Sequence, residues 1–82
     1  MFDIYMVGGI MMPLVIAPLN QLLKVIKILA DAKSKKHLEN LGITIDSEIT
    51  ILQSQGGNLI LKVKEGRLAI DREIATKIIV TA

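Results

Sequence analysis

The chain has no cysteine, and among its 82 residues only Phe2 and Tyr5 are aromatic. The lack of cysteine excludes disulfides and thiolate metal sites. Proteins that bind single-stranded nucleic acids usually stack bases on aromatic side chains, so we expect no nucleic-acid partner. His37 is the single histidine, and no second nitrogen or sulfur ligand lies near it in the sequence. We therefore expect neither a metal site nor a cofactor.

The chain is instead rich in aliphatic residues, and 51% of it is hydrophobic. A core of Ile, Leu and Val suits a small β barrel, and this length predicts one domain. The first 23 residues carry one charge, Asp3, and glycines and prolines interrupt their apolar run. Without a basic leader region or about 20 uninterrupted apolar residues, this run predicts neither a signal peptide nor a spanning helix. We expect a cytoplasmic protein.

Apolar alternation and turn residues predict five short strands, one short helix and a further helical turn. The expected strands are residues 23–29, 48–53, 58–64, 67–70 and 77–81. The expected helix spans 35–41, begins after Asp31 or Ser34, packs through Leu38 and Leu41, and ends at Gly42. Asp71 is expected to cap the helical turn. These elements predict a mainly β fold, a small five-stranded SH3-like barrel, because a flat sheet would leave one aliphatic face in water.

Positive charge is concentrated between residues 24 and 36, which hold five lysines against one acid, Asp31. Such a cluster can attract an acidic protein surface or phospholipid headgroups, although a solvated face is the simpler explanation. The candidate partner-binding residues are Lys24, Lys27, Lys33, Lys35, Lys36 and His37.

No pattern in the chain predicts catalysis. The Gly56-Gly57 pair lies in an expected hairpin and lacks the strand-to-helix context of a phosphate loop. No serine has a histidine and acid arranged as partners. Asp71 and Glu73 could act as acid and base only in a shaped cleft, which so small a barrel seldom has. We therefore expect a binding module and not an enzyme.

Several short segments, in order, resemble the ferrous iron transport protein A family, FeoA, whose members are small cytoplasmic SH3-like proteins. The matching segments are HLENLGI at 37–43, EITIL at 48–52, GRLAI at 66–70 and IIV at 78–80. The tripeptide Met12-Pro13-Leu14 matches a common family start. The resemblance predicts a FeoA-like SH3-like barrel domain at 12–82 and an apolar N-terminal extension at 1–11.

The chain departs from the family pattern at three places. His37 stands where the family usually has arginine, which leaves a weaker and pH-sensitive charge. Leu19-Asn20 and Ile45-Asp46 stand where the family has Pro-Gly pairs. Asn and Asp are the non-glycine residues that best tolerate left-handed backbone, so we expect both turns to keep their geometry.

The resemblance implies a small accessory protein of bacterial ferrous iron uptake. It would bind or regulate FeoB, a membrane iron permease with a cytoplasmic G-protein domain, and reach the membrane only through that partner without binding iron itself. The alternative is an SH3-like regulatory module related to the C-terminal domain of iron-dependent transcriptional repressors. The absence of a helix-turn-helix pattern and the scarcity of Glu and His ligands disfavour a free-standing repressor. A third possibility is a small RNA-binding barrel that uses the lysines of residues 24–36.

Overall fold

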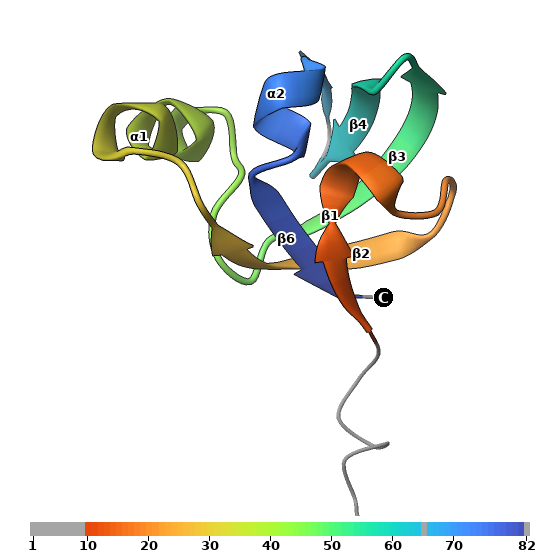
Figure 1. Cartoon of the computed structure of the whole chain (residues 1–82), viewed down its shortest axis with the longest axis horizontal. Coiled ribbons are helices and arrows are strands. Elements are labelled where there is room, and N and C mark those ends of the chain that lie inside the picture. Colours follow the sequence, from red (N-terminus) through yellow and green to blue (C-terminus); the bar gives the residue numbers. More distant parts are fainter. Residues whose placement is uncertain (1–9, 65, 82) are drawn as a thin grey trace, which may run out of the picture.

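A computed structural model describes residues 10–64 and 66–81 of the chain, which form one sheet with two helices beside it (Figure 1). The elements in order are β1 (Met11–Pro13), the 3₁₀ helix η2 (Leu14–Ile16), β2 (Leu22–Ile28), α1 (Ala32–Asn40), β3 (Glu48–Gln55), β4 (Asn58–Val63), β5 (Gly66–Ile70), α2 (Arg72–Ala75) and β6 (Ile78–Thr81). The mainly β composition that the sequence predicts is confirmed.

The strands form one antiparallel sheet in the order β1-β6-β2-β3-β4-β5. The sheet is not closed, and it has six strands, so the predicted five-stranded barrel was wrong in these two details. The strand that the prediction missed is β1, whose three residues include Pro13 and show no alternation. A proline is tolerated there because β1 is an edge strand, where a missing N–H costs no ladder hydrogen bond.

Strand β2 links the two halves of the sheet. Its first residues pair with β3, its later residues pair with β6, and a bulge lies between Val25 and Lys27. Such an extra residue bends a strand and increases its twist. Strict alternation from Leu23 and Val25 would place Lys27 in the core, but the bulge keeps Lys27 exposed and buries Ile28 instead. The bulge thus places Lys24 and Lys27 on the same outer face of the sheet.

The inner face of the sheet packs into one aliphatic core, and no polar side chain is buried within the described ranges. The buried residues are Leu14, Ala17, Leu23, Val25, Ile28, Leu38, Ile43, Ile49, Ile51, Leu59, Leu61, Val63, Ile70, Ala75, Ile78 and Val80. Helix α1 contributes only Leu38, which is 1% exposed. Leu41 is 38% exposed, so the expectation that it packs beside Leu38 was wrong. Leu41 follows the last helical residue, at the cap position, where the chain turns away toward Gly42.

Asp71 is confirmed as a cap, and of the two candidates for the start of α1 the cap is Asp31. Ser34 lies inside the helix, which begins three residues earlier than the predicted 35–41 and ends at Asn40. Asp31 accepts a hydrogen bond from the Ser34 backbone N–H at 2.8 Å, and Asp71 accepts one from the Ile74 N–H at 2.9 Å. Each satisfies an N–H that the first turn of its helix leaves without an internal partner.

The turns also follow the sequence. Asn20 (φ 58°) and Asp46 (φ 75°) adopt left-handed backbone, as expected where they replace family glycines. Gly56 and Gly57 both have positive φ in the two-residue connection between β3 and β4, the pattern of a type I′ hairpin turn.

Candidate partner-binding surfaces

Helix α1 stands away from the sheet and is attached through its C-terminal end (Figure 1). There the Ile43 N–H donates to the Leu38 carbonyl at 2.9 Å, and the Gly42 N–H donates to the Glu39 carbonyl at 3.0 Å. This pair of bonds, with Gly42 at φ 95°, is the Schellman arrangement that ends helices. Leu38 and Ile43 are both buried in the core, so this junction fixes α1. Most of the remaining helix surface faces solvent.

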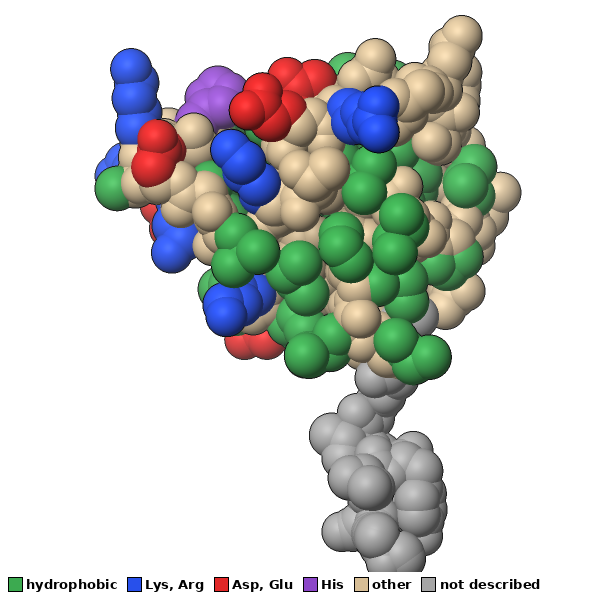
Figure 2. All heavy atoms as spheres, in the orientation of Figure 1, with side chains coloured by type: hydrophobic (Ala, Val, Ile, Leu, Met, Phe, Trp, Pro, Cys, Tyr) green, Lys and Arg blue, Asp and Glu red, His purple; other side chains and the backbone are tan. Residues whose placement is uncertain are grey.

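The candidate binding residues from the sequence fall into two groups, and all six are exposed. Lys24 and Lys27 lie on β2, whereas Lys33, Lys35, Lys36 and His37 lie on α1. At about 100° per residue, Lys33, Lys36 and His37 share one side of α1, and Lys35 points to a different side. The structure thus brings together two lysines and His37 on one side of α1 and, separately, two lysines on β2. Figure 2 shows charged side chains around the α1 end of the molecule.

Lys24 has a neighbouring acid. Its Nζ lies 3.8 Å from an Asp46 carboxylate oxygen, and both side chains are more than half exposed. Water screens such a pair, and exposed pairs contribute about 0–1 kcal/mol to stability. The pair therefore lowers the local positive charge without rigidly fixing the lysine.

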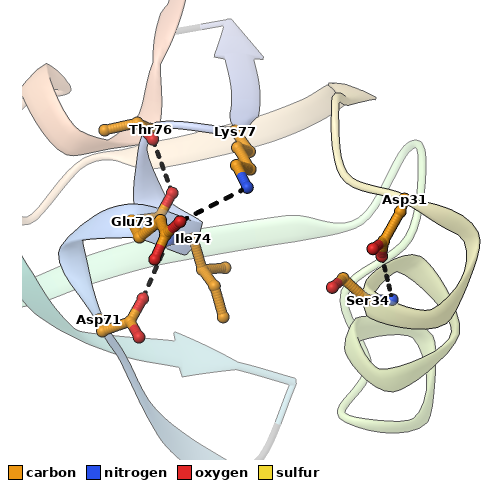
Figure 3. A network of polar contacts seen from close by, with 7 residues as sticks. All are labelled: Asp31, Ser34, Asp71, Glu73, Ile74, Thr76 and Lys77. Carbon is orange, nitrogen blue, oxygen red and sulfur yellow. Dashed lines mark hydrogen bonds and ion pairs between the residues drawn. The ribbon is translucent and has the colours of Figure 1, made fainter.

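A cleft of about 240 Å³ separates α1 from α2 (Figure 3). The lining residues are Ala30, Ser34 and Leu38 on one side and Asp71, Glu73, Ile74 and Lys77 on the other. Leu38 is buried, Ala30 and Ile74 are half-buried, and both acids are exposed. The cleft therefore combines an apolar floor with a rim that carries both signs of charge. Its size and composition suit one apolar side chain of a partner protein, with polar neighbours on either side.

The polar groups around this cleft have local structural partners (Figure 3). The Ser34 backbone N–H, and after it the Ser34 side chain, hold the pKa of Asp31 below its usual value. Glu73 lies 3.9 Å from Lys77, and its backbone carbonyl accepts the Thr76 hydroxyl at 2.6 Å. Asp71 is already engaged as the cap of α2. The geometry thus gives Asp71 and Glu73 structural roles and does not pair them as acid and base.

The sequence singled out Asp71 and Glu73 but did not locate the cleft. Its two sides are about 40 residues apart in the chain, so no local spacing connects them. A pairing between the loop before α1 and the residue that leads into β6 brings them together, because the Leu29 N–H donates to the Lys77 carbonyl at 2.7 Å.

Across the described part of the chain, no three His, Asp or Glu side chains are grouped so that they could hold a metal ion. No helix in residues 10–64 and 66–81 has the length and hydrophobicity needed to cross a membrane.

The open SH3-like sheet, the projecting helix and the cleft beside it define a small, mainly β domain. Comparison with known families specifies which domain this is. The model of the FeoA domain family matches residues 12–82, and the chain belongs to this family. The resemblance seen in the sequence is thereby confirmed.

Solved structures agree with this assignment. A crystal structure of an iron uptake regulatory protein (FeoA) has a TM-score of 0.81 and 25% identity, covering 88% of this chain and 97% of that one. An NMR structure of a FeoA-like protein from Clostridium acetobutylicum has a TM-score of 0.74 and 22% identity, covering 85% and 84% of the two chains.

The same fold occurs within a larger regulator. A manganese-dependent transcriptional repressor has a TM-score of 0.80 and 18% identity, covering 90% of this chain but 42% of the repressor. At this identity the likeness concerns the fold alone. No significant match was found among curated protein sequences.

Proposed function

We propose that this protein is a small accessory protein of ferrous iron uptake that binds the cytoplasmic domain of a FeoB-type iron permease. The observation that carries the proposal is the FeoA family match over residues 12–82, supported by the similar structure of an iron uptake regulatory protein. On this proposal the protein is cytoplasmic and acts by binding, not by catalysis.

The surface around α1 is the proposed docking site. Lys33 and Lys36 form its charged side, with His37 next to them, and the cleft beside Leu38 and Ile74 forms its apolar part. An acidic partner surface would be drawn to the cations, and one of its apolar side chains would enter the cleft. Exposed charges of this kind act mainly on the association rate and are screened by salt.

Binding of the full chain to the isolated FeoB cytoplasmic domain, followed by biolayer interferometry at several salt concentrations, tests the proposal. The double variant Lys33→Gln/Lys36→Gln should bind about two- to thirtyfold more weakly, because exposed ion pairs contribute about 0.2–1 kcal/mol each. Its association rate should also depend less on salt. The matched control is Lys24→Gln/Lys27→Gln, which removes the same charge from β2 and should bind like the wild type.

Two results would count against the proposal. If the protein binds the FeoB cytoplasmic domain at no salt concentration, that domain is not its partner. Equal losses in both double variants would show that net charge, and not the α1 surface, governs binding.

The likeness to part of a metal-dependent repressor supports one alternative, a regulatory module of the kind found in such repressors. The neighbouring genes distinguish the two functions. A gene for a large membrane G protein beside the gene of this protein would support the role in ferrous iron uptake.

A further inference from the structure

A groove of about 170 Å³ borders α1 on a different side from the cleft between α1 and α2. We call it the Ile45 groove, and its lining residues are Ile28, Lys35, Glu39, Ile43, Thr44 and Ile45. Ile28 and Ile43 belong to the core and give the groove an apolar floor, whereas Ile45 is 51% exposed. The groove thus combines apolar side chains with one cation and one acid.

Helix α1 therefore has three different sides. Lys35 and Glu39 are four residues apart, so they lie on the same side of the helix and line the Ile45 groove together. The residues one position before each of them line the cleft between α1 and α2. At about 100° per residue, Lys33 and Lys36 fall on a third side, which faces away from both. Glu39 is the single acid of α1, so this third side carries no negative charge.

The turn that carries Ile45 is fixed by hydrogen bonds. The Ser47 N–H donates to the Thr44 carbonyl at 3.0 Å, and the Ser47 hydroxyl accepts from the Thr44 N–H at 2.9 Å. The Asp46 N–H donates to the Val25 carbonyl at 2.7 Å, which ties the turn to β2. With Asp46 at φ 75°, this is the geometry of a type II turn, in which proline suits the position of Ile45. Neither the turn nor the core therefore requires an isoleucine there.

An exposed isoleucine on a fixed turn is suited to bind an apolar group of a partner. Because the turn already holds its backbone, binding would cost little conformational freedom. Single exposed apolar residues are ordinary on protein surfaces, but Ile45 adjoins two buried isoleucines in one groove. The groove and the cleft thus offer apolar contacts on two sides of α1, and the lysines lie on the third.

We infer that the partner of the proposed function holds α1 in a concave acidic surface, with one apolar edge in the cleft and another against Ile45. A helix with its side chains is about 10 Å wide, so a flat surface cannot reach the lysines and both hollows together. Acids inside the concave surface would face Lys33 and Lys36. This inference rests on the proposed function and adds the shape of the partner surface and a second contact.

Replacing Ile45 with serine tests the second contact. In binding measurements with the isolated FeoB cytoplasmic domain, Ile45→Ser should bind about three- to tenfold more weakly, because the burial of a half-exposed isoleucine is lost. The matched control is Leu19→Ser, which should bind like the wild type. Leu19 is 46% exposed and precedes the left-handed Asn20, as Ile45 precedes Asp46. The turn before β2 lies at the opposite end of the molecule from α1 (Figure 1).

Alkylation of single introduced thiols gives a second measurement, because the chain has no cysteine of its own. Ile45→Cys places a thiol in the Ile45 groove, and Glu73→Cys places one in the cleft between α1 and α2. Leu19→Cys is the control. The FeoB cytoplasmic domain should slow the alkylation of the first two and leave the third unchanged. Circular dichroism checks that each variant keeps the wild-type fold.

The outcomes separate the two proposals. If the wild type does not bind the FeoB cytoplasmic domain, the proposed function fails and the inference fails with it. If Lys33→Gln/Lys36→Gln weakens binding but Ile45→Ser does not, or if the domain protects Glu73→Cys alone, the partner contacts one side of α1, and the inference is overturned while the proposed function stands. Equal losses in Ile45→Ser and Leu19→Ser would also overturn it. So would a wild-type dimer in sedimentation equilibrium that Ile45→Ser dissociates, because a second copy would then occupy the groove.

Discussion

Replacing Leu38 with alanine tests how α1 is held to the domain. Leu38 is 1% exposed and is the only buried residue of the helix, so the change removes the main apolar anchor of a nine-residue element. Leu→Ala changes in cores cost about 2–5 kcal/mol. A helix of this length is unstable in water by itself, so α1 depends on this contact. If α1 detaches while the sheet stays folded, Leu38→Ala can lower the free energy of unfolding by no more than the free energy with which α1 packs on the sheet.

We therefore expect Leu38→Ala to lower the free energy of unfolding by at least about 2 kcal/mol, out of about 4–12 kcal/mol for 82 residues. The melting temperature should fall by about 10 °C. The matched control is Leu41→Ala at the cap of the same helix, where the side chain is partly exposed and the loss should stay below about 1 kcal/mol.

Urea unfolding followed by circular dichroism gives both free energies, and amide exchange reports on α1 separately from the sheet. The α1 amides should lose protection in Leu38→Ala and keep it in Leu41→Ala. Equal losses in the two variants, or protected α1 amides in Leu38→Ala, would refute the view that one leucine anchors the helix.

Two further predictions concern a turn and a cap. Gly57→Ala should destabilise the protein by about 1–3 kcal/mol more than Gly56→Ala in thermal melts. Both glycines have positive φ, but only a Cβ added at position 57 would meet Arg72 Cγ, at 2.6 Å. Equal melting temperatures of the two variants would exclude this crowding. Because the pKa of Asp31 is lowered in the folded state, its ionised carboxylate stabilises α1 at pH values above the usual pKa of aspartate. This stabilisation is lost as the pH falls through the lowered pKa. The protection factors of the α1 amides, which are corrected for the intrinsic pH dependence of exchange, should therefore fall in acid for the wild type. They should change less for Asp31→Asn, which keeps a capping oxygen without titrating; matching pH profiles would show that this cap does not stabilise the helix.

The sequence was most informative where a local rule decides the structure. The cap at Asp71 and the left-handed turns at Asn20 and Asp46 follow from the chemistry of single residues and were predicted correctly. For α1 the sequence offered both Asp31 and Ser34, and Asp31 is the cap. Strand β1 was missed because three residues with a proline carry no periodic signal, and its pairing with β6 joins opposite ends of the chain.

The candidate surfaces were harder to predict than the elements that carry them. The lysines between residues 24 and 36 look like one cluster in the sequence, but the structure distributes them over a strand and a helix. The cleft between α1 and α2 depends on tertiary pairing. A bulge, moreover, reverses which side of β2 Lys27 occupies.

The bulge in β2 also bears on how such domains can change in length. On either side of Ile26 the strand keeps its own alternation, and without that residue it would read as one uninterrupted alternating strand with the same inner and outer faces. A relative could therefore lack a residue here while its remaining β2 side chains stay on the same faces of the sheet. One residue inserted elsewhere in β2 would move the buried side chains that follow it to the solvent face and the exposed ones to the core. Alignments of these short sheets should accordingly allow a one-residue gap at this position and resist one within the flanking pairs.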